Sequence, residues 1–297
     1  MAIETKLAVP AKSPSPALSE ILFRWPKRAW TVGRNLLGEC SASIRETKNF
    51  RSGFRLCADF ALSRLLPYLP KQLRNRERQV ELRNGTRLRY RLNRGDIQGI
   101  REVWLERAYR LPFSISNSVL IDLGANIGLT SVWLAREYGF ASVIAVEPDA
   151  GNAALVQKNF DLNGIPGKVL QAAIGPSDGT ARFQAAAESN LGQLSQEGQA
   201  VTVVSMRTIL DRFRLSQLDL VKMDIEGSEQ ALLTGPAEWL SRTTAMIAEF
   251  HPTLVDYPRL TGLLEQRGFK YVRANTVFAN NMDSFYRPEQ AGAAVRS

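Results

Sequence analysis

The sequence has few of the residues from which metal centres and disulfide frameworks are built. Its 297 residues include one histidine, His251, and two cysteines, Cys40 and Cys57. Two cysteines are too few to predict a disulfide framework or a zinc site, and a single histidine argues against a histidine-rich metal centre. We therefore predict that the cysteines stay reduced and that the protein is cytoplasmic.

Long apolar runs are also missing. No window approaches the ~18 consecutive apolar residues of a membrane-spanning helix. No basic start is followed by the ~7–15 apolar residues of a signal peptide. Residues 1–18 instead have three prolines among serine and alanine, which predicts a disordered leader.

Acidic residues are scarce in the front part of the chain. Residues 1–110 have 23 Lys and Arg against 10 Asp and Glu, whereas residues 111–297 have 15 against 19. The basic front predicts an acidic partner, such as an anionic membrane to which the protein binds peripherally, or a charged glycan; nucleic acid is not expected. The same charges also fit arginines that are simply solvated on helices.

The length and the apolar pattern predict one α/β domain behind a smaller appendage. We divide the chain into a leader, a basic helical extension, a hairpin-and-helix segment and a main domain, with bounds 1–18, 19–75, 76–115 and 116–297. Tryptophan beside arginine in the extension is typical of a helix at a membrane surface, but a helical cap packed on the main domain is the favoured interpretation. Helices are predicted at Phe54–Leu69 and Asp96–Tyr109, and Asn84-Gly85 predicts a hairpin turn.

The main domain begins with a β-α-β unit. Val119–Ile121 is a short apolar run that predicts a buried strand ending at Asp122. A glycine-bearing turn leads into helical spacing, and a second apolar strand ends at Glu147. The whole unit has the ~30 residues that such a motif needs.

The turn after the first strand predicts a nucleotide site. Gly124 permits a sharp bend and a close ligand, and unpaired amides at the start of the helix favour an anionic group. Asp122 suits a ligand's ammonium group, and Glu147 suits a ribose diol. The site residues predicted from this unit are Asp122, Gly124, Ala125, Asn126, Gly128 and Glu147.

Two cofactor classes compete for this turn. The dinucleotide fingerprint G-x-G-x-x-G, started at Gly124, requires glycine where Asn126 and Leu129 stand. S-adenosylmethionine needs only one open turn and two acidic residues. The residues therefore favour S-adenosylmethionine over NAD or NADP.

Two later strands end in acidic residues. Leu218–Met223 leads into D-I-E-G-S-E, and Ala245–Ala248 leads into E-F-H. Because the carboxyl ends of parallel strands meet at one edge, we expect the following side chains to form the catalytic end of the site: Asp224, Glu226, Glu249 and His251. His251 suits a general base, a carboxylate could serve instead, and a carboxylate pair could hold a divalent metal. The spacing does not decide between these roles, and no metal ligand is predicted.

Three motifs in order resemble one known family. I-D-L-G-A-N-I-G, then A-V-E-P, then V-K-M-D-I-E-G-S-E are similar to the FkbM-type methyltransferases, over about Thr86–Arg287. The resemblance implies an S-adenosylmethionine-dependent enzyme of class I methyltransferase fold. That fold is an α/β, Rossmann-like seven-stranded sheet with helices on both faces, here behind an N-terminal helical extension.

The resemblance adds further site residues. In this fold class the end of the third strand, expected at Val169–Ile174, passes the adenine ring, so that Ala173 and Ile174 would line it. Glu102 and Tyr109 are expected at the rim of the site. The polar stretch 189–199 predicts a loop over the site.

From these features we predict an O-methyltransferase that acts on a hydroxyl of a sugar, glycan, glycolipid or secondary metabolite. The substrate class comes from the resemblance alone. The alternatives are a nucleotide-dependent oxidoreductase and a membrane-docking binding module with an inactive methyltransferase-like domain.

Overall fold

The fold is known from a computed structural model of the chain. It describes residues 35–184, 193–195, 198–251, 253–273 and 282–291. Residues 39–297 form one compact unit, and residues 1–38 form another, of which only residues 35–38 are described. The predicted leader therefore lies outside the described residues, as does the extension as far as residue 34. The predicted division into four segments stays a prediction.

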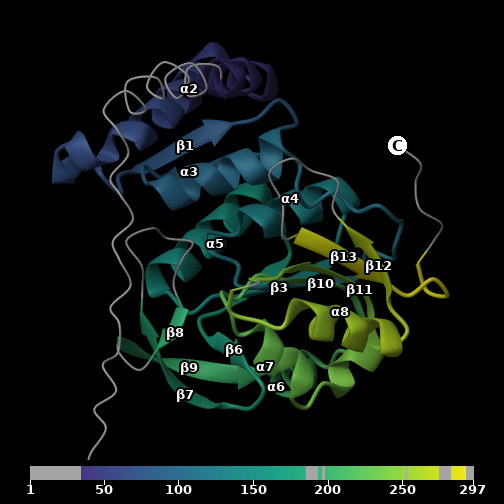
Figure 1. The fold of residues 1–297 in the computed structure, drawn as a ribbon. Coiled ribbons are helices and arrows are strands. Elements are labelled where there is room, and N and C mark those ends of the chain that lie inside the picture. Colours follow the sequence, from purple (N-terminus) through teal and green to yellow (C-terminus); the bar gives the residue numbers. More distant parts are fainter. Residues whose placement is uncertain (1–34, 185–192, 196–197, 252, 274–281, 292–297) are drawn as a thin grey trace, which may run out of the picture. The chain divides into compact units, whose positions relative to one another are not determined.

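A seven-stranded sheet lies at the centre of the compact unit (Figure 1). Its strands, in spatial order, are β12 (Lys270–Arg273), β13 (Met282–Tyr286), β11 (Thr243–Glu249), β10 (Leu218–Met223), β3 (Val119–Leu123), β4 (Ser142–Val146) and β5 (Gly167–Leu170). The five strands from β11 to β5 are parallel, and β13 is antiparallel to both of its neighbours. This strand order, with one reversed strand near the edge, is that of a class I methyltransferase. The predicted fold is confirmed.

Helices cover both faces of this sheet, α3, α4 and α5 on one side and α6, α7 and α8 on the other (Figure 1). Their bounds are Arg94–Ile100, Leu129–Tyr138, Ala150–Asn163, Met206–Phe213, Glu229–Thr234 and Tyr257–Gln266. A 3-10 helix, Glu238–Arg242, precedes β11. Ile121 and Val221 of the sheet belong to one buried cluster with Ile209, Leu232 and Leu260 of the second helical layer. Strands buried on both faces read as continuous apolar runs, which is why the sequence located them well.

The strand expected at Val169–Ile174 is wrong as a single element. β5 ends at Leu170, and Ala173–Gly175 form a separate strand, β6, in a second sheet of four strands. Its order is β6, β9 (Gln199–Ser205), β7 (Gly179–Gln184) and β8 (Gln193–Ser195). The Ala172 amide still donates to Glu147 O at the end of β4, and from Ala173 onward the chain pairs with β9 instead.

The stretch expected to be a loop over the site is described only in part. Residues 193–195 form β8, which pairs antiparallel with β7, so this part of the prediction is wrong. Residues 189–192 and 196–197 lie outside the described residues.

The segment before the main domain contains the predicted hairpin. β1 (Glu77–Glu81) and β2 (Arg87–Arg91) pair antiparallel. The helix expected at Phe54–Leu69 is α2 (Phe50–Leu65), followed by 3-10 turns at Leu66–Tyr68 and Lys71–Leu73. The single helix expected at Asp96–Tyr109 is instead α3 and then a π-helix, Arg101–Leu105.

The prediction of reduced cysteines is wrong. Cys40 and Cys57 form a disulfide, with a Cα–Cα distance of 4.6 Å. The bridge joins α2 to the helix that ends at residue 46. The disulfide could not be predicted from the sequence, because two cysteines 17 positions apart do not indicate that the helices carrying them pack together. The cytoplasmic location that we derived from free thiols has lost that support.

We expect the disulfide to stabilise the folded chain by about 3 kcal/mol, because it closes a short loop of the unfolded chain. Reducing agent should lower the free energy of unfolding of the wild type by that amount, as measured by urea denaturation. A Cys40→Ser, Cys57→Ser double variant is the control and should not respond to reductant. A wild type that is equally stable with and without reductant would contradict the bridge.

None of the helices that the structure describes is both long enough and apolar enough to cross a membrane.

Candidate functional site

A cavity of about 350 Å³ lies at the carboxyl ends of the parallel strands. Parallel α/β sheets bind ligands at this edge, and the volume falls within the range of small-molecule sites. Its walls come from the turn after β3, the ends of β4, β10 and β11, the start of β6, and the segment from α3 to the π-helix. The residues that carry the argument below are Glu102, Asn126, Glu147, Asp224, Glu226 and His251.

Glu147 closes one end of this cavity. Its side chain is almost fully buried, and its two carboxylate oxygens accept hydrogen bonds from the backbone amides of Asn126 (2.8 Å) and Asp149 (2.9 Å). The Asn152 side-chain amide donates a third bond, of 3.3 Å. Burial nevertheless dominates and raises the pKa of Glu147 to about 7. Since each carboxylate oxygen can accept two hydrogen bonds, Oε1 is filled by the bonds from Asp149 and Asn152, and Oε2, which accepts only from Asn126, keeps capacity for one hydroxyl donor from a ligand.

The turn after β3 is held by the protein itself. The amides of Gly124 and Ala125 donate to Val146 O, and the Gly128 amide donates to Ala125 O. Together with the Asn126 bond to Glu147, these contacts use amides that we expected to be unpaired. Gly124 has φ +74°, and a Cβ there would lie 1.8 Å from Asp224 O. A side chain at this position would collide with the residue that follows β10, so glycine is required here whether or not a ligand is bound.

Asp122 does not line the cavity. It is fully buried, accepts a 2.6 Å hydrogen bond from Ser131 Oγ, and pairs with Lys222 Nζ at 3.1 Å. Its position does not support the direct contact with a ligand ammonium that we expected. Gly128 is also outside the cavity wall, since it caps α4.

Lys222 is the site residue that sequence reasoning missed. Its ammonium is buried, donates to Gly124 O at 2.7 Å and lies 3.8 Å from the Asp224 carboxylate. Burial acts to lower the pKa of Lys222, but Asp122 and Asp224 outweigh it and raise that pKa. The signal was a lysine inside a strand whose six residues are all buried. A buried charge is almost always paired, so its partners could have been sought among the acids nearby.

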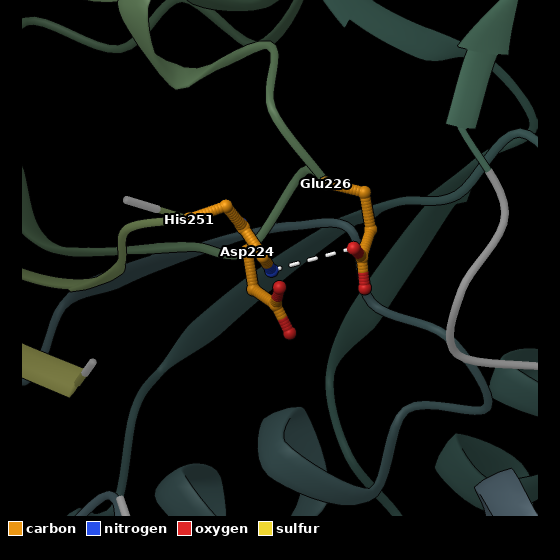
Figure 2. Close-up of side chains that lie close together, drawn as sticks. All are labelled: Asp224, Glu226 and His251. Carbon is orange, nitrogen blue, oxygen red and sulfur yellow. Dashed lines mark ion pairs between the residues drawn. The ribbon is translucent and has the colours of Figure 1, made fainter. Parts of the chain in front are cut away.

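The opposite end of the cavity brings together the four residues predicted from the strand tips. Asp224 and Glu226 follow β10, Glu249 ends β11, and His251 comes two residues later. Figure 2 shows the side chains of Asp224, Glu226 and His251 converging, with His251 Nε2 3.3 Å from Glu226 Oε2. One ligand atom from each of these three lies within 4.8 Å of the others.

A fifth residue, Glu229, orients the histidine. It is fully buried at the start of α7, and its Oε1 lies 3.1 Å from His251 Nδ1. The same oxygen accepts weak bonds from the amides of Ile225 and Gly227. Glu226 has φ +51°, a left-handed conformation in which the backbone between Asp224 and Glu229 folds back on itself. The sequence suggested only a helix-start charge for Glu229.

The crowding of acids shifts the pKa values of several groups in this cluster. Burial and the neighbouring carboxylates raise the pKa of Glu226 to about 7 and that of Glu249 to about 8. The hydrogen bond to Glu229 and the nearby acids raise the pKa of His251 to about 9. Such displaced values at the wall of a cavity are typical of functional sites.

Four further residues named in the sequence analysis also line the cavity, and their roles there stay predictions. Ala173 and Ile174 line the cavity at the start of β6, and Glu102 and Tyr109 line it from the π-helix and the segment after it. Burial raises the pKa of both Glu102 and Tyr109. A π-helical segment is frequently found beside a functional site.

A model of one protein family, described as the methyltransferase FkbM domain, matches residues 122–271, just over half of the chain. The chain belongs to the FkbM methyltransferase family. The predicted methyltransferase activity is therefore confirmed, and so is the cofactor that goes with it, S-adenosylmethionine. The matched segment contains both ends of the cavity, at Glu147 and at His251.

Three curated relatives are similar to this FkbM methyltransferase over most of their own length. Methyltransferase sdnD of Sordaria araneosa is 27% identical over 60% of this chain and 84% of its own length. The 31-O-demethyl-FK506 methyltransferase FkbM of Streptomyces tacrolimicus is 25% identical over 65% and 89%. The hexuronic acid methyltransferase AglP of Haloferax volcanii is 27% identical over 57% and 74%.

Among solved structures, methyltransferase FkbM of Methylobacillus flagellatus KT aligns with a TM-score of 0.46 and 19% identity. The alignment covers 86% of this chain and 60% of that one.

Proposed function

We propose that this FkbM-family protein transfers the methyl group of S-adenosylmethionine to a hydroxyl group of a sugar or a sugar-bearing metabolite. The observation that supports it is one cavity with two different ends: a buried acid at Glu147, and the polar cluster at Asp224, Glu226, Glu249 and His251. The methyl donor can then be held at one end of the cavity and the acceptor hydroxyl at the other, with the methyl group between them.

The Glu147 end fits the nucleoside of the cofactor. In its charged form, a carboxylate that already accepts two backbone hydrogen bonds is held in a fixed orientation, which suits it to accept from one ribose hydroxyl directly and from the second in place of the 3.3 Å bond from Asn152. Ala173 and Ile174 offer an apolar wall for the adenine ring beside it. Gly124, Ala125 and Asn126 line the path from this end toward β10.

The other end fits an acceptor hydroxyl. The acceptor oxygen forms a bond to the methyl carbon while the bond between that carbon and sulfur breaks. The electron pair of the broken bond stays on sulfur, which becomes a neutral thioether. The hydroxyl proton passes to a group among Asp224, Glu226, Glu249 and His251. These residues hold the acceptor in place and take that proton, which are the two tasks that an activated methyl donor leaves to the protein.

A sugar acceptor is supported by the polar character of this end and by one relative, which is named for a hexuronic acid. Transfer to an oxygen is supported by a second relative, which is named for 31-O-demethyl-FK506. Several carboxylates facing one cavity offer hydrogen-bond acceptors for a polyol. Their negative charge favours a neutral sugar over an acidic one.

The two alternatives are less well supported. An oxidoreductase would need close approach of a pyrophosphate at the turn, where Asn126 Oδ1 is buried and its backbone amide is used by Glu147. Calorimetric titration with S-adenosylmethionine, NAD and NADP separates a methyltransferase from an oxidoreductase, since we expect only S-adenosylmethionine to bind. An inactive binding module would bind the cofactor without turning over any acceptor in a screen with labelled methyl donor.

We expect Glu147→Ala to weaken S-adenosylmethionine binding by more than about tenfold, because charge-assisted hydrogen bonds of about 1.5–3 kcal/mol are lost. Calorimetric titration of the full chain measures the change. Asp211→Asn is the control, since that carboxylate is exposed on α6, and it should bind as the wild type does. Unchanged affinity in Glu147→Ala would remove the ribose assignment.

The pH dependence of binding offers a second test of Glu147. Because its pKa is raised to about 7, the carboxylate is mostly neutral at pH 6 and mostly charged at pH 8. Hydroxyl donors prefer the charged form, so wild-type affinity should rise about tenfold over this interval, by linkage. Glu147→Gln, which cannot ionise, should lack the increase. Parallel pH profiles for the two proteins would contradict the role.

The expected anionic membrane partner stays a proposal, supported now by α2. Phe50 and Phe54 are exposed and stack on each other, with exposed Arg51 and Arg55 beside them. Exposed aromatic rings between arginines are suited to the surface of an anionic bilayer.

We expect the full chain to co-sediment with phosphatidylserine vesicles and not with phosphatidylcholine vesicles, and binding should weaken as salt is raised. The Phe50→Ser, Phe54→Ser variant should lose most of this binding. Leu254→Ser, which removes an exposed apolar side chain elsewhere, is the control. Equal sedimentation with both lipids would contradict an anionic membrane as partner.

A further inference from the structure

We propose that Asp224, Glu226 and His251 bind a divalent cation at the acceptor end of the cavity. This rests on the proposed function for its purpose, which is to hold the acceptor hydroxyl, but the site itself is argued from the protein's own groups. One ligand atom from each of the three lies within 4.8 Å of the other two.

The spacing fits a common cation. His251 Nε2 and Glu226 Oε2 are 3.3 Å apart, close to the separation of about 3 Å expected for two adjacent ligands at about 2.1 Å from an ion. Asp224 reaches the same point from the end of β10, as the converging side chains of Figure 2 show. Two carboxylates and one imidazole suit a transition ion such as Mn²⁺ better than Ca²⁺, which prefers oxygen ligands alone.

The second argument is the support behind the histidine. Glu229 Oε1, fully buried, lies 3.1 Å from Nδ1, so it accepts the proton of that nitrogen. A cation would displace the proton of Nε2, the atom directed at Glu226 and Asp224, and bind the lone pair there. Histidine ligands of metal ions almost always donate their other ring N–H in this way, and the carboxylate raises the basicity of the ligand nitrogen.

The third argument is the excess of negative charge. Among the described residues, the cationic neighbours of the partly buried Asp224 and Glu226 carboxylates are Lys222 at 3.8 Å and His251 at 3.3 Å. Lys222 is already paired with Asp122, and Glu229 and Glu249 add two more acids. Carboxylates crowded together in this way repel one another, and a divalent ion would compensate several of them at once.

Three protein ligands would leave positions open on the ion. In catalytic metal sites such positions are taken by water or substrate. Here they face the cavity, where a hydroxyl and a neighbouring oxygen of a sugar could bind together. The ion would lower the pKa of the bound hydroxyl and fix its oxygen for attack on the methyl group.

The test uses the full chain, stripped with a chelator and desalted, and titrated with Mn²⁺ in the absence of cofactor and acceptor. Electron paramagnetic resonance reports free Mn²⁺, and we expect one saturable site per chain. Asp224→Asn, Glu226→Gln and His251→Ala should each weaken binding by more than about tenfold. Glu229→Gln, which only positions the histidine, should weaken it less.

Two controls separate this proposal from the proposed function. Glu147→Gln should lose cofactor affinity and keep the Mn²⁺ site, and Asp211→Asn should keep both. Circular dichroism verifies that each variant is folded, and any one folded ligand variant suffices for the comparison. No saturable Mn²⁺ binding, or equal binding in wild type and ligand variants, would overturn the cation site and leave the methyltransferase assignment intact. Loss of turnover when a chelator is added, and its return when Mn²⁺ is added back, would link the cation site to methyl transfer.

Discussion

His251→Ala is expected to lower turnover by about 10²- to 10⁴-fold while leaving S-adenosylmethionine affinity within about twofold of the wild type. The histidine lies at the acceptor end of the cavity, and Glu147, which we assign to the ribose, lies at the other. Whether the imidazole takes the hydroxyl proton or binds a cation that acidifies the hydroxyl, its loss affects the chemical step. Turnover with labelled donor, and cofactor affinity by calorimetry, measure the two effects separately.

Glu229→Gln tests how the histidine acts. The amide oxygen can still accept from His251 Nδ1, so the ring stays in place, but the negative charge that raises its pKa is lost. We expect an intermediate loss of turnover, smaller than that of His251→Ala. Equal activity of His251→Ala and the wild type would leave a carboxylate as the base, and loss of cofactor affinity in His251→Ala would show that the residue is structural.

The parts of the site that the sequence located well are those set by strand ends. Apolar runs that stop at an acid, as at Glu147 and Asp224, place that acid at the carboxyl edge of a parallel sheet whatever the details of packing. Local sequence is enough for this, because both the strand and its end are local. The family motifs added the order of these strands.

The features that the sequence analysis did not predict depend on contacts between segments that are distant in the chain. Lys222 looked like one charge in an apolar strand until its pairing with Asp122, a hundred positions earlier, was known. The end of β5 could not be placed because β6 changes partner to β9, thirty positions later along the chain. The Cys40–Cys57 bridge likewise depends on how two helices pack.

The role of Gly124 illustrates the same limit within a motif. The glycine was predicted from a sharp bend of the backbone and a closely approaching ligand. Its missing Cβ makes room for Asp224 O, on the adjacent strand end. A motif can therefore identify a residue correctly while the physical cause lies in a contact that the motif does not contain.

Lys222→Met is expected to cost about 3–5 kcal/mol of stability, since it leaves Asp122 buried without its counter-charge. Asp122 is fully buried, and among the described residues only the Ser131 hydroxyl would still contact its carboxylate. The lysine also donates to Gly124 O, so the turn that faces the cofactor loses its link to β10. Urea denaturation of the full chain measures the loss, and cofactor affinity should fall with it.

The double variant Asp122→Asn, Lys222→Met is the matched control. It removes both charges from the same buried place and keeps nearly the same volumes, so most of the lost stability should return. A double variant as unstable as Lys222→Met would show that the aliphatic stem and the bond to Gly124 O matter more than the charge pair. A Lys222→Met variant as stable as the wild type would contradict a charged lysine in this strand, and with it the electrostatic link between the cofactor turn and the acceptor end.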